Sequence, residues 1–178
     1  MYAFNYHKPK SLSEAQALLA KLPEGKLLAG GHTLIPTLKQ RLAQPSDLID
    51  IGGIAELKGI QVSGSAVTVG AGTPHNAVAR SADVKKAIPA LALLASGIGD
   101  RQVRNRGTIG GSLANSDPAA DYPGAVLGLG ATIHTTKRAI KADDFFKGMF
   151  ETALEEGEII TKVEFPVPKR AGYVKFAN

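Results

Sequence analysis

Hydrophobic positions in the first fifty residues alternate between a helical period and short strand-like runs. Apolar residues at helical spacing over 15–22 follow Ser11-Leu-Ser-Glu14, a capping-box sequence, and predict a helix that begins beside Ser11. Short apolar runs at 26–29 and 47–51 predict strands. Between them, leucines at every fourth position predict a helix over 34–42. This first part is therefore expected to be a β-α-β unit with glycines at its strand-to-helix turn.

The pattern changes near Gly59, where short β-branched runs replace the helical period. Residues 59–62 and 66–70 flank a Ser-Gly-Ser turn and predict a hairpin. Strand character returns at 131–135 and 159–165.

Prolines mark three predicted helix starts in this second part. Thr73-Pro74 and Asp117-Pro118 each place a capping residue before a proline at the first helical position, and the latter predicts a helix over 119–129. Pro89 predicts another helix that ends at Ser96. We expect an α+β fold with two subdomains, residues 1–56 and 57–178.

Composition narrows the function classes. No stretch of the 178 residues approaches the roughly 18 apolar residues of a membrane helix, and the N-terminus shows no signal-like apolar region, so a cytoplasmic location without a membrane span is expected. Cysteine is absent, which excludes thiol nucleophiles and cysteine-ligated clusters within this chain. The four histidines show no metal-ligand spacing, so no metal site is expected.

The chain is basic, with a formal net charge of +5 and a pI of about 9.5. This charge suits an anionic ligand or partner. Nucleic acid is a weaker alternative, because no run of Lys and Arg interleaves with aromatic residues as stacking platforms require.

The first glycine cluster is Leu27-Leu-Ala-Gly-Gly-His-Thr-Leu-Ile35. Its predicted strand delivers Gly30 and Gly31 to a turn, and Thr33 can cap the helix that follows. Glycine lets a ligand approach the backbone closely, and amides at a helix start bind anions. Taken alone, this cluster is also explained by a tight turn that needs glycine only for its geometry. His32 could steer a phosphate or a flavin, or serve only as a turn residue.

The second cluster is Arg106-Gly-Thr-Ile-Gly-Gly-Ser112, predicted as a loop with hydroxyls at Thr108 and Ser112. Arg101, Arg104 and Arg106 add positive charge, although at least one of them is expected only to face solvent. We expect a side chain at Gly110 to block the approach of a phosphate while leaving the protein folded.

Neither cluster matches a common nucleotide-binding fingerprint. The sequence has no GxxxxGK[ST] and no GxGxxG. The remaining hypothesis is a cradle in which two separate glycine turns face one elongated anion, such as the pyrophosphate of a dinucleotide.

Three segments carry a resemblance to a known family: Ala29-Gly-Gly-His-Thr33, Thr108-Ile-Gly-Gly111 and the run from Ser112 to Asp121. They resemble the FAD-binding medium subunits of the carbon monoxide dehydrogenase and xanthine dehydrogenase family of molybdenum hydroxylases. The similarity runs from Tyr6 to Phe176. It implies the two-subdomain α+β FAD-binding domain of the vanillyl-alcohol oxidase-like (PCMH) class. Family members continue into a C-terminal α/β domain, which we expect to be absent from this chain.

The resemblance also implies roles for residues. In the family, both glycine loops hold the FAD pyrophosphate through backbone amides, and an acidic residue matching Asp121 lies on the ribityl and adenosine side. Ile98 matches an apolar residue against the flavin ring, and Ile159 and Ile160 match a strand near the site. The implied cofactor-binding set, without catalytic residues or metal ligands, is Leu28, Ala29, Gly30, Gly31, His32, Thr33, Leu34, Ile98, Thr108, Ile109, Gly110, Gly111, Ser112, Asp121, Ile159 and Ile160.

The function implied by the resemblance is electron transfer within a hetero-oligomer. FAD would receive electrons from an iron–sulfur small subunit, after a molybdopterin large subunit has oxidised the substrate, and would pass them to an external acceptor. Two alternatives stay open: a scaffold domain that has lost FAD, and a stand-alone flavin oxidoreductase.

Overall fold

The N-terminal part of the chain folds around a small parallel sheet. The computed structural model describes residues 1–176, and the sheet has the strand order β1-β3-β2. Its elements are β1 (Asn5–His7), α1 (Leu12–Lys21), β2 (Lys26–Leu28), α2 (Leu34–Lys39), β3 (Asp47–Asp50) and the 3-10 helix η1 (Ala55–Leu57). The predicted cap of α1 is confirmed, because the Ser11 hydroxyl accepts a hydrogen bond from the Glu14 amide.

The larger part is built on a five-stranded antiparallel sheet of order β4-β5-β10-β6-β7. Its strands are β4 (Ile60–Ser63), β5 (Ala66–Gly70), β6 (Thr132–Thr135), β7 (Ala139–Lys141) and β10 (Ile160–Pro166). The predicted hairpin is the β4–β5 pair, and strand β10 lies between β5 and β6. A short separate hairpin joins β8 (Phe146–Gly148) and β9 (Glu151–Thr152).

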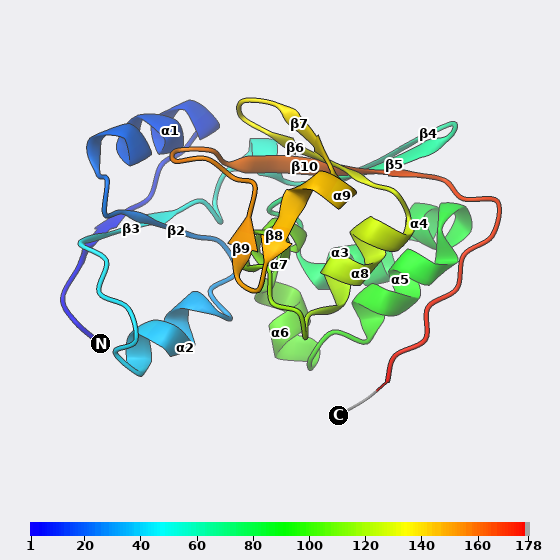
Figure 1. Cartoon of the computed structure of the whole chain (residues 1–178), viewed down its shortest axis with the longest axis horizontal. Helices are drawn as coiled ribbons and strands as arrows, with labels where there is room; N and C mark the ends of the chain where they lie inside the picture. The colour runs from blue at the N-terminus through cyan, green and yellow to red at the C-terminus, as the bar shows by residue number, and fades with distance from the viewer. Residues whose placement is uncertain (177–178) are drawn as a thin grey trace.

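Helices cover one face of this sheet, as Figure 1 shows. They are α3 (His75–Arg80), α4 (Ala82–Ala87), α5 (Pro89–Ser96), α6 (Arg101–Arg106), α7 (Ile109–Asn115), α8 (Asp121–Gly128) and α9 (Ala142–Phe145). Side chains of β5, β6 and β10 that face the helices, including Val69, Ile133 and Val163, are fully buried in one apolar core with them.

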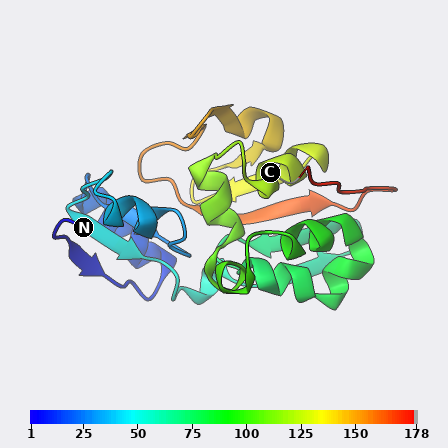
Figure 2. The same ribbon diagram turned by 90° about the horizontal axis from the view of Figure 1, so that it is seen from below.

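A second, smaller core lies between helix α1 and the parallel sheet, and Figure 2 shows the two parts of the fold side by side. Its buried members are Ala15, Ile49, Ile51, Ile54, Leu57 and Ile159. Ile159 comes from the loop before β10, which reaches toward β2 and β3 beneath α1 (Figure 1). The loop therefore joins the two parts of the fold.

Several expected boundaries are wrong for local reasons. Helix α2 ends at Lys39 rather than residue 42, because Arg41 adopts a left-handed φ of 60°. Helix α3 has Pro74 as its N-cap instead of Thr73, whose hydroxyl is taken by the backbone of Gly59. Helix α8 begins at Asp121, since the Asp117 carboxylate closes a turn with the Ala119 amide.

Candidate functional site

The two glycine clusters meet in direct backbone contact. A Cβ placed on Gly30 would lie 2.2 Å from the carbonyl oxygen of Arg106 and 2.7 Å from the Cα of Gly107. Only glycine allows this approach, because no side chain fits between the two turns. The turn after β2 and the turn between α6 and α7 therefore share one surface.

The first turn presents a run of backbone donors. In the described part of the chain, no acceptor is recorded for the amides of residues 30–34. His32 and Thr33 are exposed, and Gly31 has a left-handed φ of 78°. Successive free amides around a left-handed residue form the kind of backbone concavity that binds anions. We call residues 30–34 the amide turn.

Thr33 occupies the N-cap position of α2, as predicted, but its side chain does not cap the helix. Thr33 lies in the right-handed region and its side chain makes no capping bond, whereas a capping residue adopts an extended backbone. Its carbonyl instead accepts from the Thr37 hydroxyl at 2.9 Å. In the first turn of α2, the Ile35 and Thr37 amides donate to the Gly31 and Thr33 carbonyls, whereas the Leu34 amide finds no acceptor within the described residues.

The second cluster is a helix start rather than the predicted loop. Thr108 is the N-cap of α7, and its hydroxyl accepts from the Gly111 amide at 3.2 Å. The Ile109 side chain is buried in the larger core. Gly111 is exposed, and a Cβ on it would lie 4.0 Å from the Cβ of Ala29. Gly111 thus opens onto the same surface as the amide turn.

Gly110 has a different role from the one expected. Its amide donates to the Ala71 carbonyl at 2.9 Å, and a Cβ on it would lie 2.6 Å from the Cβ of Ala71. Gly110 is therefore needed for packing of α7 against the end of β5. A side chain at Gly110 would therefore strain the packing of α7 on Ala71, which argues against the expectation that such a change leaves the fold intact.

The arginines lie on helix α6, and they differ in their contacts. The Arg104 guanidinium donates to the carbonyls of Ile98 at 3.1 Å and Gly99 at 2.7 Å. It thereby fixes the turn that carries the half-buried Ile98 side chain. Arg101 and Arg106 are exposed, and the carbonyl of Arg106 packs against Gly30. The backbone of Arg106 thus lies at the meeting point of the two turns, whereas the Arg104 guanidinium is used to fix the preceding turn.

Asp121 is held by the last described segment of the chain. Its carboxylate accepts hydrogen bonds from the Tyr173 hydroxyl and, at 3.0 Å, from the Lys175 ammonium. Burial and the bond to Asp121 raise the pKa of Tyr173 to about 12. Sequence reasoning assigned no role to Tyr173 or Lys175. A contact between Asp121 and residues 52 and 54 positions away has no local signal.

The remaining predicted residues divide between the surface and the interior. Leu28, Ala29 and Leu34 are half-buried around the amide turn, and Ser112 is half-buried on α7. Ile159 and Ile160 are buried in the smaller and the larger core, respectively. The structure thus brings the two glycine clusters together but buries the side chains of both isoleucines in the apolar cores.

A buried histidine beneath the junction was also missed. His75 is 5% exposed, and its ring lies 5.2 Å from that of Tyr122. A Cβ on Gly107 would lie 2.7 Å from His75 Nε2, and the His75 amide donates to the Gly107 carbonyl. Burial lowers the pKa of His75 to about 4, so the imidazole is neutral at physiological pH. His75 supports the second turn from below.

This arrangement suits binding of an elongated anion. Clustered backbone amides and nearby guanidinium groups favour phosphate oxygens. Within the described residues, no group of three or more histidine or acidic side chains could hold a metal ion. None of the helices described is long and apolar enough to cross a membrane.

Comparisons with known proteins agree with this geometry. Residues 2–168 match the family model described as the FAD binding domain in molybdopterin dehydrogenase. The carbon monoxide dehydrogenase medium chain of Hydrogenophaga pseudoflava is 46% identical over 170 residues, which cover 92% of this chain and 58% of the relative. The glyceraldehyde dehydrogenase medium chain of Sulfolobus acidocaldarius is 40% identical, with 92% of this chain and 60% of the relative covered.

Solved structures give the same result. Quinoline 2-oxidoreductase from Pseudomonas putida 86 superposes with a TM-score of 0.91 at 39% identity, over 94% of this chain and 60% of that chain. The α+β fold is the one expected from the resemblance. The chain spans about three fifths of the length of these relatives. With the family model matched along nearly all of its length, this chain belongs to the family of FAD-binding domains of molybdopterin dehydrogenases.

Proposed function

We propose that this chain is the FAD-binding part of a molybdenum hydroxylase and that the amide turn holds the FAD pyrophosphate. The supporting observation is the direct contact between Gly30 and the Arg106–Gly107 turn, beside the free amides of residues 30–34. Two linked phosphates need several donors in a row, and the amide turn offers them beside helix α6, which carries three arginines.

The other predicted residues receive roles from their positions. Gly111 and Ser112 extend the surface along α7, and Arg104 fixes the turn of Ile98. Asp121, with Tyr173 and Lys175, provides a polar group whose charge is already balanced. Because the side chains of Ile159 and Ile160 are buried, any contact of these two residues with FAD would use their backbone.

The chain itself binds and orients, and the isoalloxazine of bound FAD supplies the redox chemistry. Electrons reach this domain from outside, because a chain without cysteine cannot hold cysteine-ligated iron–sulfur clusters. We therefore include in the proposal an iron–sulfur small subunit, a molybdopterin large subunit, transfer to an external acceptor, and a cytoplasmic location. Relatives are named for carbon monoxide, glyceraldehyde and nicotine, so we assign no substrate.

The division into subdomains 1–56 and 57–178 is part of the same proposal. It is supported by the two separate sheets and by two apolar cores. The FAD surface would then lie between the subdomains, since each contributes one glycine turn.

Titration of the purified chain with FAD, ADP and riboflavin tests the proposal. FAD and ADP should both bind, because each carries a pyrophosphate, whereas riboflavin should bind far more weakly. A chain that stays colourless after incubation with FAD and desalting, and that ignores ADP, would support the scaffold alternative. Binding of riboflavin as tightly as FAD would contradict the assignment of the amide turn.

A further inference from the structure

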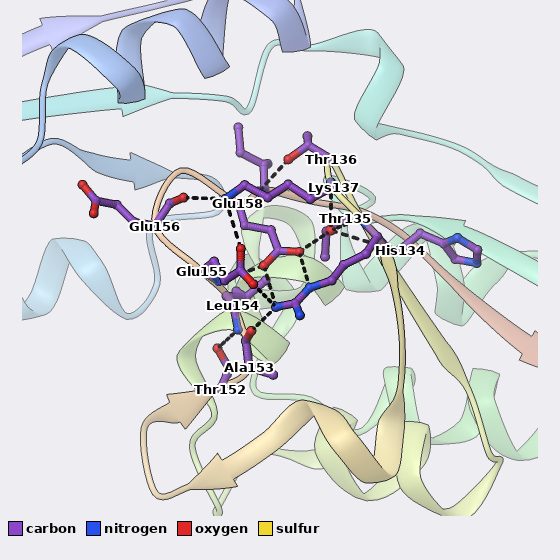
Figure 3. Close-up of polar contacts among 12 residues, drawn as sticks. His134, Thr135, Thr136, Lys137, Thr152, Ala153, Leu154, Glu155, Glu156 and Glu158 are labelled. Atoms are coloured by element: carbon purple, nitrogen blue, oxygen red, sulfur yellow. Dashed lines mark hydrogen bonds and ion pairs between the residues drawn. The ribbon is translucent and has the colours of Figure 1, made fainter.

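A dense polar cluster lies outside the proposed FAD surface, where the loop before β10 meets the turn between β6 and β7 (Figure 3). At its centre the Glu158 carboxylate, whose side chain is fully buried, faces the Arg138 guanidinium in a two-point contact at 3.2 and 3.3 Å. The Thr135 hydroxyl donates to Glu158 at 2.6 Å, and the Glu155 amide donates at 2.8 Å. We call Arg138, Glu158 and Thr135 the clamp.

The clamp leaves Glu158 no capacity for a ligand. Both carboxylate oxygens already accept two hydrogen bonds each. Arg138 is also engaged by the Ala153 carbonyl at 2.7 Å. A buried carboxylate with this many donors is a fixed structural point, because breaking one partner would leave an uncompensated charge.

Ile159, the residue that follows Glu158, connects the clamp to the N-terminal part of the molecule. The Ile159 amide donates to the Thr136 hydroxyl at 3.2 Å, and the Ile159 carbonyl accepts from the Thr136 amide at 2.9 Å. The Ile159 side chain is 1% exposed in the smaller core. The other buried residues described in that core lie at or before position 57, so Ile159 is the one that the larger part contributes.

Ile159 and the glycine junction are therefore two points at which the N-terminal part contacts the larger part. The junction has no spare room, since Gly30 already lies against the Arg106 carbonyl. A small shift of Ile159 within the smaller core would change the relative position of the two glycine turns. A directional ion pair fixes such a position better than apolar packing, because it requires one geometry.

We propose that the Arg138–Glu158 pair is a positioning device that holds Ile159 in the N-terminal core and so sets the distance between the two glycine turns. Glu158 acts through Ile159 and touches no cofactor. The consequence for FAD affinity rests on the proposed function, whereas the consequence for the geometry of the two parts does not.

The absence of cysteine allows a direct distance measurement. Cysteines introduced at the exposed Lys39 of α2 and Lys85 of α4 carry a unique pair of spin labels, one on each part. Pulsed electron resonance then gives the distance distribution without any cofactor. Glu158→Gln should broaden or shift this distribution. Glu156→Gln is the matched control, because Glu156 is exposed and contributes to the cluster only its backbone carbonyl.

FAD titration of the same variants, at a temperature where each is folded, gives the second readout. Glu158→Gln should raise the FAD dissociation constant about tenfold, as expected for one weakened charge-assisted bond, with Glu156→Gln unchanged. If Glu158→Gln fails to fold, Arg138→Lys replaces it, since lysine keeps the charge but loses the two-point contact. A folded clamp variant with the wild-type distance distribution overturns the inference. Failure of the wild type itself to bind FAD would instead overturn the proposed function.

Discussion

Replacing Gly30 with alanine tests the contact between the two glycine turns. The new Cβ would lie 2.2 Å from the Arg106 carbonyl oxygen, whereas ordinary contacts begin at 3.4 Å. The neighbour is backbone and cannot rotate away, so the two turns must separate by about 1.2 Å, an overpacking that typically costs about 1–3 kcal/mol.

Such a displacement exceeds the tolerance of hydrogen bonds from the amide turn to phosphate oxygens. These bonds span about 2.7–3.2 Å, and each one to a charged group contributes about 1.5–3 kcal/mol. Loss of one bond should therefore weaken FAD binding about 10- to 100-fold. Fluorescence titration with FAD gives the dissociation constant, and thermal unfolding shows the temperature range in which the variant is folded.

Gly124→Ala is the matched control for this prediction. Gly124 is an exposed position in α8, and a Cβ on it would meet nothing within 4 Å. Alanine there should stabilise the helix by up to about 1 kcal/mol and leave the dissociation constant unchanged. A folded Gly30→Ala variant with wild-type affinity for FAD would show that this contact does not position the amide turn for the cofactor.

Three further predictions concern stability. Burial opposes ionisation of Glu158, but Arg138, the Glu155 amide and Thr135 outweigh it and lower the pKa of Glu158 from 4.5 to about 2. The ionised Glu158 therefore stabilises the folded protein fully above pH 4.5, and this contribution is lost as the pH falls toward 2. Urea unfolding between pH 4.5 and 2 should show a loss of about 3 kcal/mol in the free energy of unfolding from this group. An equally steep pH dependence in Glu158→Gln would show that Glu158 is not its source. Arg104→Ala removes the bonds to the Ile98 and Gly99 carbonyls and should cost about 1–2 kcal/mol, with the exposed Arg101→Ala as a near-neutral control; equal costs would show that the bonds contribute nothing. Tyr122→Phe removes a buried hydroxyl for which the described residues provide no partner, so the unfolding free energy should stay equal or rise by up to about 1 kcal/mol, and a large loss would reveal a partner.

Local sequence signals predicted those elements whose causes are local. The capping box at Ser11 and the hairpin around Gly64 need only neighbouring residues, and both are present. The polar strand β1 was missed, because its residues Asn5–His7 form a strand only through pairing with β3, 42 positions away.

The candidate site shows the same division. Glycine content indicated the two turns, but helices α6 and α7 were missed. The glycine-rich run of α7 has low helix propensity, and the polar run Arg101–Arg106 of α6 shows no apolar periodicity. Helix α7 forms nevertheless, since Thr108 caps it and Gly110 packs on Ala71. The neighbours of Asp121 and the anchoring of Ile159 depend on residues far away along the chain. Neither leaves a periodic signal.

Backbone amide spectra of the isotope-labelled chain, recorded with and without ligands, show directly whether the amide turn holds the pyrophosphate. FAD and ADP should shift the amide signals of Gly31, His32 and Thr33 and protect them from hydrogen exchange, while riboflavin should leave them unchanged. FAD binding that leaves these three amides unshifted and unprotected would contradict that role of the amide turn.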